Sequence, residues 1–352
     1  MRVLFVSDFP HLPDIKGGLQ TTTHDLCLAM GVMGAEAAVL CGLYRPGEQT
    51  EPAAADLTYQ SVSDEALGYL CMRAASPAAA LPLAAAAWNA SVIVVQSGTA
   101  LSHMVLASLR TGRATAVYLH NVEAHQLGGA LLADPSLLYL ANSAFTAARW
   151  RALCGVHCHV IEPVVCAGNY ITGDGGSGGG SKVLFVNPTP IKGVELMFAL
   201  AAYCPDLPFL VVESWGLEAN WRAHCQHRAH ALGNVQWLGP QDDMRGVYAQ
   251  ARVLLMPSVW EEAFGRTVIE AQLNGLPVLA SNRGALPETV GNGGLTLDPH
   301  APVEVWAEAL RDVLARHASF SAAAQHRALA HAAATPLITA QLLSLLAEHA
   351  LR

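Results

Sequence analysis

Two glutamates with seven residues between them are the residues whose type and spacing point most directly to chemistry. Glu262 falls in a loop after an apolar, strand-like run at residues 253–256, and Glu270 falls about one turn into the helix predicted after Gly265. Backbone N–H groups and the positive end of the helix dipole favour a diphosphate at such a helix start. A helical carboxylate offers two acceptor oxygens to a ribose diol. The alternative is an acidic turn followed by a solvated glutamate, because acidic residues are common near helix starts.

These glutamates belong to the second of two stretches with the same organisation. Each stretch begins with a short apolar run, at residues 3–6 and 183–186, and continues through glycines into a helical pattern. Further apolar runs alternate with helical stretches of roughly 10 to 15 residues, as parallel βαβ units require. These runs are residues 37–40, 92–95, 116–119 and 138–141 in the first half, and 209–212, 235–238, 253–256 and 277–280 in the second. The sequence therefore predicts an α/β protein with two doubly wound halves.

Length and composition agree with this organisation and exclude other classes of protein. The 352 residues are enough for two domains, and 52% hydrophobic against 14% charged residues is too apolar for a disordered chain. The net charge of −8 argues against nucleic acid as a partner. Eight scattered cysteines, no recognisable secretory leader and no uninterrupted apolar segment of membrane-spanning length predict a cytoplasmic protein with no transmembrane segment.

A glycine- and serine-rich run at residues 173–181 separates the halves. It has no apolar residue to bury and has the composition of a flexible coil, either a natural linker or an engineered replacement for a loop. We predict one domain at residues 1–172 and a second at 182–335, with 173–181 as the linker. A final helix at 336–352, set off by Pro336, is expected to pack back on the N-terminal domain.

The motif around the two glutamates resembles the signature of retaining GT-B glycosyltransferases, the group 1 or family four class. That signature reads "PS...E.FG...EA...G.PV", and this chain carries it from Pro257 to Val278. The likeness covers most of residues 182–300 and fits the N-terminal half loosely. It implies two Rossmann-like domains facing across a cleft, with the acceptor on the N-terminal side and a nucleotide-sugar donor held mainly by the C-terminal domain.

The resemblance also implies roles for residues of the motif itself. Glu270 would bind the ribose, and Glu262 would lie beside the donor sugar. The hydroxyl groups of that sugar would also meet backbone groups of Ala263, Phe264 and Gly265. The site residues implied by the resemblance do not require a metal ion.

Lys192 and Gly193 match a basic residue followed by glycine at the first helix of the family's donor domain. A lysine there would neutralise the diphosphate as charge builds on the leaving nucleotide, whereas the alternative is a solvated lysine at a helix start. Asn187 stands where the family usually has an arginine that also contacts phosphate. Asparagine brings no charge. Phosphate binding must then be weaker, or be supplemented by another cation such as Arg266, or the activity has been lost; we favour a working variant.

Two features of the N-terminal half match the family more weakly. Gly17 and Gly18 resemble its first glycine loop, which approaches the diphosphate and acceptor. His120 follows the run at 116–119 and matches a histidine that faces the donor sugar, and the carboxyl end of a strand in an open α/β sheet is where ligands bind. Chance placement is the alternative, because the chain has 15 histidines.

The implied activity is transfer of a sugar from a nucleoside diphosphate sugar to an acceptor hydroxyl, with retention and without a separate cofactor. UDP is the nucleotide expected from family frequency, and polysaccharide or glycoconjugate synthesis is the expected role. The acceptor, a carbohydrate, lipid-linked or small molecule, stays open, as does peripheral membrane contact. Two other functions stay open: a nucleotide-sugar epimerase of related fold, which needs further acid and base residues, and a non-catalytic nucleotide-sugar-binding protein.

Two groups of cysteine and histidine are interpreted as structural rather than as zinc sites. The group at residues 154–159 includes an alternating, strand-like pattern, and the group at 224–230 lies in a helical stretch with several alanine and arginine neighbours. We therefore expect no metal ion in either place.

Overall fold

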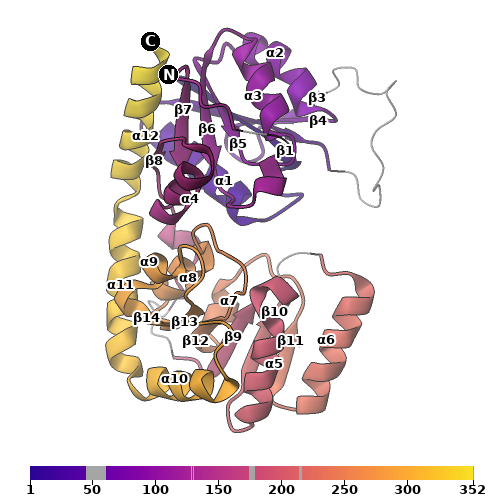
Figure 1. Ribbon diagram of the computed structural model, residues 1–352, viewed down its shortest axis with the longest axis vertical. Coiled ribbons are helices and arrows are strands. Elements are labelled where there is room, and N and C mark those ends of the chain that lie inside the picture. Colours follow the sequence, from indigo (N-terminus) through magenta and orange to yellow (C-terminus); the bar gives the residue numbers. More distant parts are fainter. Residues whose placement is uncertain (45–60, 128, 130, 174–178, 214–215, 352) are drawn as a thin grey trace. The chain divides into compact units, whose positions relative to one another are not determined.

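The computed structural model describes residues 1–44, 61–127, 129, 131–173, 179–213 and 216–351, and the chain forms two compact units (Figure 1). Unit 1 comprises Met1–Val164 and Ala334–Arg352, and unit 2 comprises Val165–Ala333. The division falls ahead of the run at 173–181, because Val165 and Tyr170 pack into the core of unit 2. Residues 174–178 of that run lie outside the described part of the chain.

Unit 1 contains an eight-stranded sheet in the order β3-β4-β2-β1-β5-β6-β7-β8. All neighbouring strands are parallel except β3 and β4. The strands are β1 (Arg2–Pro10), β2 (Glu36–Gly42), β3 (Ser61–Asp64), β4 (Leu70–Ala74), β5 (Val92–Gln96), β6 (Ala114–Leu119), β7 (Leu137–Ala141) and β8 (Cys158–Val160). The helices are α1 (Gly18–Val32), α2 (Pro77–Ala87), α3 (Leu101–Leu109), α4 (Ala144–Cys154) and α12 (Thr335–Ala350), with the 3₁₀ turn η2 (Ala124–Leu127).

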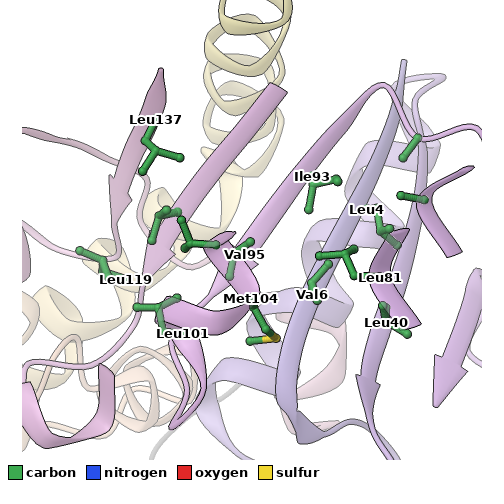
Figure 2. Close-up of a cluster of buried hydrophobic side chains, with 14 of the residues drawn as sticks. Leu4, Val6, Leu40, Leu81, Ile93, Val95, Leu101, Met104, Leu119 and Leu137 are labelled. Atoms are coloured by element: carbon green, nitrogen blue, oxygen red, sulfur yellow. The ribbon is translucent and has the colours of Figure 1, made fainter. Parts of the chain in front are cut away.

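Both faces of this sheet are buried, which explains why its central strands are continuous apolar runs. On one face, Leu4 and Val6 of β1 pack with Leu81 of α2 and Met104 of α3 (Figure 2). On the other face, residues of β1 pack with α1 and α12, whose Leu342 and Leu346 are fully buried. The last helix is therefore part of the core of unit 1.

Strands β3, β4 and β14 (Gly294–Leu297) are not among the apolar runs that the sequence predicts as strands. Arg73 interrupts the apolar residues of β4, which makes the segment resemble a surface. In the structure Arg73 is buried, pairs with Asp14 at 3.3 Å and with Asp64, and donates to Leu12 O at 2.8 Å. A buried guanidinium is tolerated because these acceptors replace water.

Unit 2 contains a six-stranded parallel sheet in the order β11-β10-β9-β12-β13-β14. Its strands are β9 (Lys182–Val186), β10 (Phe209–Val212), β11 (Val235–Leu238), β12 (Ala251–Met256), β13 (Val278–Ser281) and β14 (Gly294–Leu297). Its α-helices are α5 (Val194–Tyr203), α6 (Ala219–Leu232), α7 (Arg245–Tyr248), α8 (Arg266–Leu273), α9 (Leu286–Val290), α10 (Val303–Ala315) and α11 (His317–Ala333). Short 3₁₀ turns are η3 (Ala167–Asn169), η4 (Pro190–Lys192) and η5 (Gly291–Gly293). The predicted α/β class with two doubly wound sheets is confirmed.

No single helix among the described residues is both long and apolar enough to cross a membrane. The length and composition are reached only when α11 and α12 are counted together as a bent pair. Both helices contribute residues to cores, Ala328 in unit 2 and Leu342 in unit 1.

Candidate active site

The most densely connected group of predicted site residues lies where β9 and β12 end in unit 2. These strands are parallel neighbours, with Val183 opposite Val253 and Leu184 opposite Leu254. The segments that follow them, residues 187–193 and 257–265, therefore leave the sheet at the same edge. This edge is where open α/β sheets bind ligands.

The two segments are joined by backbone hydrogen bonds. The carbonyl of Ile191 accepts from the backbone N–H groups of Val259 at 3.0 Å and Trp260 at 3.2 Å. Gly193 has φ +82°, and a Cβ at this position would lie 2.0 Å from the backbone oxygen of Pro257. Glycine is therefore required here by both the left-handed backbone and the close approach. The contact of Gly193 with Pro257 also fixes the backbone of the preceding residue, Lys192.

Lys192 and Glu262 form an ion pair across this junction. Lys192 Nζ lies 2.5 Å from Glu262 Oε1, which also accepts from Ser258 Oγ at 2.7 Å. Their side chains are 18% and 11% exposed, so water screens the pair only partly. An incoming phosphate must compete with Glu262 for the charge of Lys192.

The second glutamate, Glu270, is also paired. Arg266 Nε lies 3.0 Å from Glu270 Oε1, and the hydroxyl of Tyr248 donates to Glu270 Oε2 at 3.0 Å. Tyr170 also contacts the arginine, with its ring centroid 5.8 Å from Arg266 Cζ. A phosphate that binds Arg266 must therefore compete with Glu270 for its charge, just as a phosphate that binds Lys192 must compete with Glu262.

Backbone geometry between the two pairs agrees with the predicted layout of strand, loop and helix. Gly265 precedes α8 with φ +86°, and no side chain caps the helix at this residue. Glu262 forms a parallel bridge with Gly284, whose added Cβ would lie 2.2 Å from the Glu262 carbonyl oxygen. Phe264 is buried in the core and its carbonyl accepts from Thr289, while Ala263 is half-buried. Phe264 is thus available to a ligand only through its backbone.

Asn187 lies in the turn after β9 with φ +66°, a conformation that asparagine adopts more readily than most residues. It is 4% exposed, and its backbone N–H donates to Val212 O at 2.8 Å. Its side-chain Oδ1 is buried without a hydrogen-bond partner among the described residues. Lys192 is consequently the predicted phosphate ligand that brings positive charge in this turn.

In unit 1, His120 directly follows β6 at the carboxyl edge of the sheet. Its backbone N–H donates to Ser97 Oγ at 2.8 Å, and its Nε2 is buried with no partner in the part of the chain that the structure describes. Burial lowers the pKa of His120 to about 3, so the imidazole is neutral near pH 7. A neutral ring with a free nitrogen can exchange a hydrogen bond with a sugar hydroxyl.

The two N-terminal glycines lie at the start of α1. Gly17 is its N-cap, and an added Cβ would lie 2.7 Å from Gln20 Oε1, while Gly18 has open space where its Cβ would be. No side chain caps this helix, so neither glycine competes with a ligand for its first N–H groups. Gly17, Gly18 and His120 are in unit 1, whereas every other predicted site residue is in unit 2.

Among the described residues, three that the sequence does not predict contact charged side chains of the predicted set through their own side chains: Ser258, Tyr248 and Tyr170. Ser258 is part of the motif, and its spacing of four from Glu262 is the sequence signal for this contact. Tyr248 and Tyr170 carry no local signal, because they meet their partners across 22 and 96 positions. No group of three or more potential metal ligands occurs within the residues described, the cysteine and histidine groups included.

Comparison with known proteins gives a family match for part of the chain. Residues 186–316 match the model of the family described as glycosyl transferases group 1. A D-inositol 3-phosphate glycosyltransferase of Corynebacterium kroppenstedtii is 40% identical over 83 residues, which are 22% of this chain and 18% of that protein. The O-antigen chain mannosyltransferase B of Escherichia coli is 38% identical over 88 residues, 24% of this chain and 22% of that protein. The matches thus span about a fifth of each curated relative.

Solved structures match over nearly the whole chain. Sucrose-phosphate synthase from Thermosynechococcus elongatus has a TM-score of 0.77 at 16% identity, covering 97% of this chain and 98% of that one. Anabaena HepE, solved with UDP and glucose, has a TM-score of 0.76 at 19% identity, covering 99% of this chain and all of that one. These likenesses confirm the predicted GT-B fold class with two Rossmann-like domains.

Proposed function

We propose that this chain, whose residues 186–316 belong to the group 1 glycosyl transferase family, is a retaining glycosyltransferase that uses a nucleoside diphosphate sugar. UDP is the proposed nucleotide, as in the UDP complexes of the similarly folded HepE. The observation that carries the proposal is the pair of carboxylate–cation contacts, Lys192 with Glu262 and Arg266 with Glu270, at the edge where β9 and β12 end.

Each charged group has a distinct task in this proposal. Glu270 accepts hydrogen bonds from the ribose diol, and Lys192 leaves Glu262 to bind the diphosphate. Glu262, released from Lys192, accepts from a hydroxyl of the donor sugar, as do backbone groups of residues 263–265. Lys192 then stabilises the negative charge that develops on the leaving diphosphate, which is electrostatic transition-state stabilisation.

The transfer step breaks the bond between the anomeric carbon and the phosphate oxygen, and the bonding electrons leave with the diphosphate. The acceptor oxygen bonds to the anomeric carbon on the same face, and its proton passes to the departing phosphate oxygen. No dedicated base is used, because the departing phosphate oxygen takes the proton. His120 and the Gly17–Gly18 helix start would act on the sugar or acceptor side from unit 1.

Polysaccharide or glycoconjugate synthesis is the proposed setting, supported by the E. coli mannosyltransferase among the relatives. The test is release of nucleotide from UDP-, GDP- and ADP-sugars, measured with and without candidate acceptors such as disaccharides and inositol phosphate. Release that needs both Lys192 and an acceptor, with the anomeric configuration kept in the product, supports the proposal. Tight donor binding without release or transfer would favour the non-catalytic binding protein, and donor isomerisation would favour the epimerase.

A further inference from the structure

The carboxylate of Glu270 is held by Arg266 and by Tyr248, and the proposed function gives Tyr248 no role. Arg266 donates to one oxygen and the Tyr248 hydroxyl donates to the other, each at 3.0 Å. Tyr248 is the last residue of α7 and is 1% exposed, and Glu270 has only 12% of its side chain exposed. The carboxylate is therefore held at both oxygens and is largely buried.

The number of hydrogen-bond positions on a carboxylate decides what this arrangement can bind. An ionised carboxylate has about four acceptor positions, two on each oxygen. In the part of the chain that the structure describes, Arg266 occupies one position on Oε1 and Tyr248 occupies one on Oε2, which leaves one position on each oxygen for a ligand. A ligand with two adjacent hydroxyl groups, such as a ribose diol, matches this pair of remaining positions.

We propose that Tyr248 is a positioning residue that orients Glu270 for the ribose diol of the donor nucleotide. The inference rests on the proposed function, because it names the group that prepares that same site. Tyr248 acts through Glu270 and does not itself touch the nucleotide.

The surroundings of Tyr248 suit this role. Its ring belongs to the apolar core cluster of unit 2 and is almost fully buried, so packing holds the hydroxyl in place. Burial, together with the charge of Glu270, raises the pKa of Tyr248 and keeps the hydroxyl protonated as a donor. A buried hydroxyl without a partner would be costly, and Glu270 supplies that partner.

The experiment compares binding of UDP with binding of 2′,3′-dideoxy-UDP to the full chain by calorimetry. The wild type is expected to bind UDP more tightly, because only UDP offers the diol to Glu270. Tyr248→Phe keeps the ring and removes the hydroxyl, and should weaken UDP about three- to tenfold, the usual range for one hydrogen bond. It should leave the dideoxy analogue unchanged, so the preference for the diol falls.

Two controls separate positioning from general loss of structure. Tyr139→Phe removes another buried hydroxyl, which donates to Leu132 O at 2.6 Å in unit 1, and should leave the UDP preference unchanged. In a Glu270→Gln background, where the diol preference is already reduced, Tyr248→Phe should lower it by less than in the wild type. If Tyr248→Phe lowers the preference for UDP over the dideoxy analogue by the same factor in both backgrounds, the two residues are not coupled.

An unchanged UDP preference in folded Tyr248→Phe would overturn the positioning role and leave the donor site standing. If UDP, GDP and ADP all fail to bind the folded wild type, the inference and the proposed function fall together. If the chain selects GDP or ADP, the same comparison is made with that nucleotide and its dideoxy form.

Discussion

The two sheet edges that carry the predicted site residues differ in how their polar groups are satisfied. In unit 2, Lys192 pairs with Glu262 and Arg266 with Glu270, so the charges cancel before any ligand arrives. In unit 1, His120 is neutral and its buried Nε2 has no partner among the described residues. The difference teaches that a donor must displace existing contacts in unit 2, whereas a ligand of unit 1 would supply a missing hydrogen bond.

The largest effect is expected from glycines that differ between these edges. Gly193→Ala should destabilise the protein by about 3 kcal/mol, because its left-handed backbone and its approach to Pro257 O both exclude a Cβ. Gly18→Ala should change stability by less than about 1 kcal/mol, since Gly18 has open space around it. Urea denaturation of both variants measures this contrast. Equal losses at the two glycines would mean that the Gly193 contact does not hold the unit 2 edge.

The buried, neutral His120 should make the protein acid-sensitive. The unfolded chain protonates a histidine near pH 6.5, but folded His120 stays neutral down to about pH 3. Between these values the unfolded state binds more protons, so stability is full above pH 6.5 and falls as the pH is lowered.

From pH 7 to pH 5 the wild type should therefore lose about 2 kcal/mol more than His120→Asn. The free energy of unfolding is measured at both pH values. His103→Asn, which removes an exposed histidine of α3, should retain the wild-type slope. If the free energy of unfolding falls equally between pH 7 and pH 5 in wild type and His120→Asn, His120 is not buried as a neutral ring.

The smallest effect is expected from the ion pair of unit 2, and it is a gain in UDP affinity rather than a loss of stability. Glu262→Gln removes the carboxylate that competes with phosphate for Lys192, so UDP without a sugar should bind about three- to tenfold more tightly, or about 1 kcal/mol. Sugar transfer should nevertheless fall, because Glu262 is proposed to contact the donor sugar.

Calorimetry with UDP tests this result. Asp206→Asn is the matched control, because it removes an exposed carboxylate that pairs with Arg311 ahead of β10 in the same unit. If Glu262→Gln binds UDP as weakly as the wild type or more weakly, the ion pair is not a competitor of the phosphate.

The same comparison explains what could be predicted from sequence. The unit 2 motif could be recognised from sequence for two reasons. Backbone segments touch at Gly193 and Gly284, where any side chain would collide. Glu262 and Glu270 also lie at a fixed spacing along one loop and helix. The apolar strands of both sheets were equally clear, since burial on both faces leaves uninterrupted hydrophobic runs.

The rest depended on contacts between distant segments. Tyr248 and Tyr170 reach Glu270 and Arg266 only after the chain has folded, and nothing near them in sequence indicates this. Strand β4 was missed because Arg73 interrupts its apolar residues. This arginine is buried only because Asp14 and Asp64, from elsewhere in the chain, pair with it. Tyr170 also explains why the division between the units precedes the Gly/Ser run, since it packs into the core of unit 2.

The central claim is that the edge of unit 2 holds the nucleotide of a sugar donor, and a thermal-shift titration tests it most directly. UDP, GDP, ADP and their common sugar conjugates are compared on the wild type, Lys192→Ala and Glu270→Ala. One nucleotide should raise Tm, with about 2.7 kcal/mol of stabilisation at a hundred times its Kd, and both substitutions should reduce that shift. No shift with any nucleotide in the folded wild type, or an undiminished shift in both variants, would contradict the account.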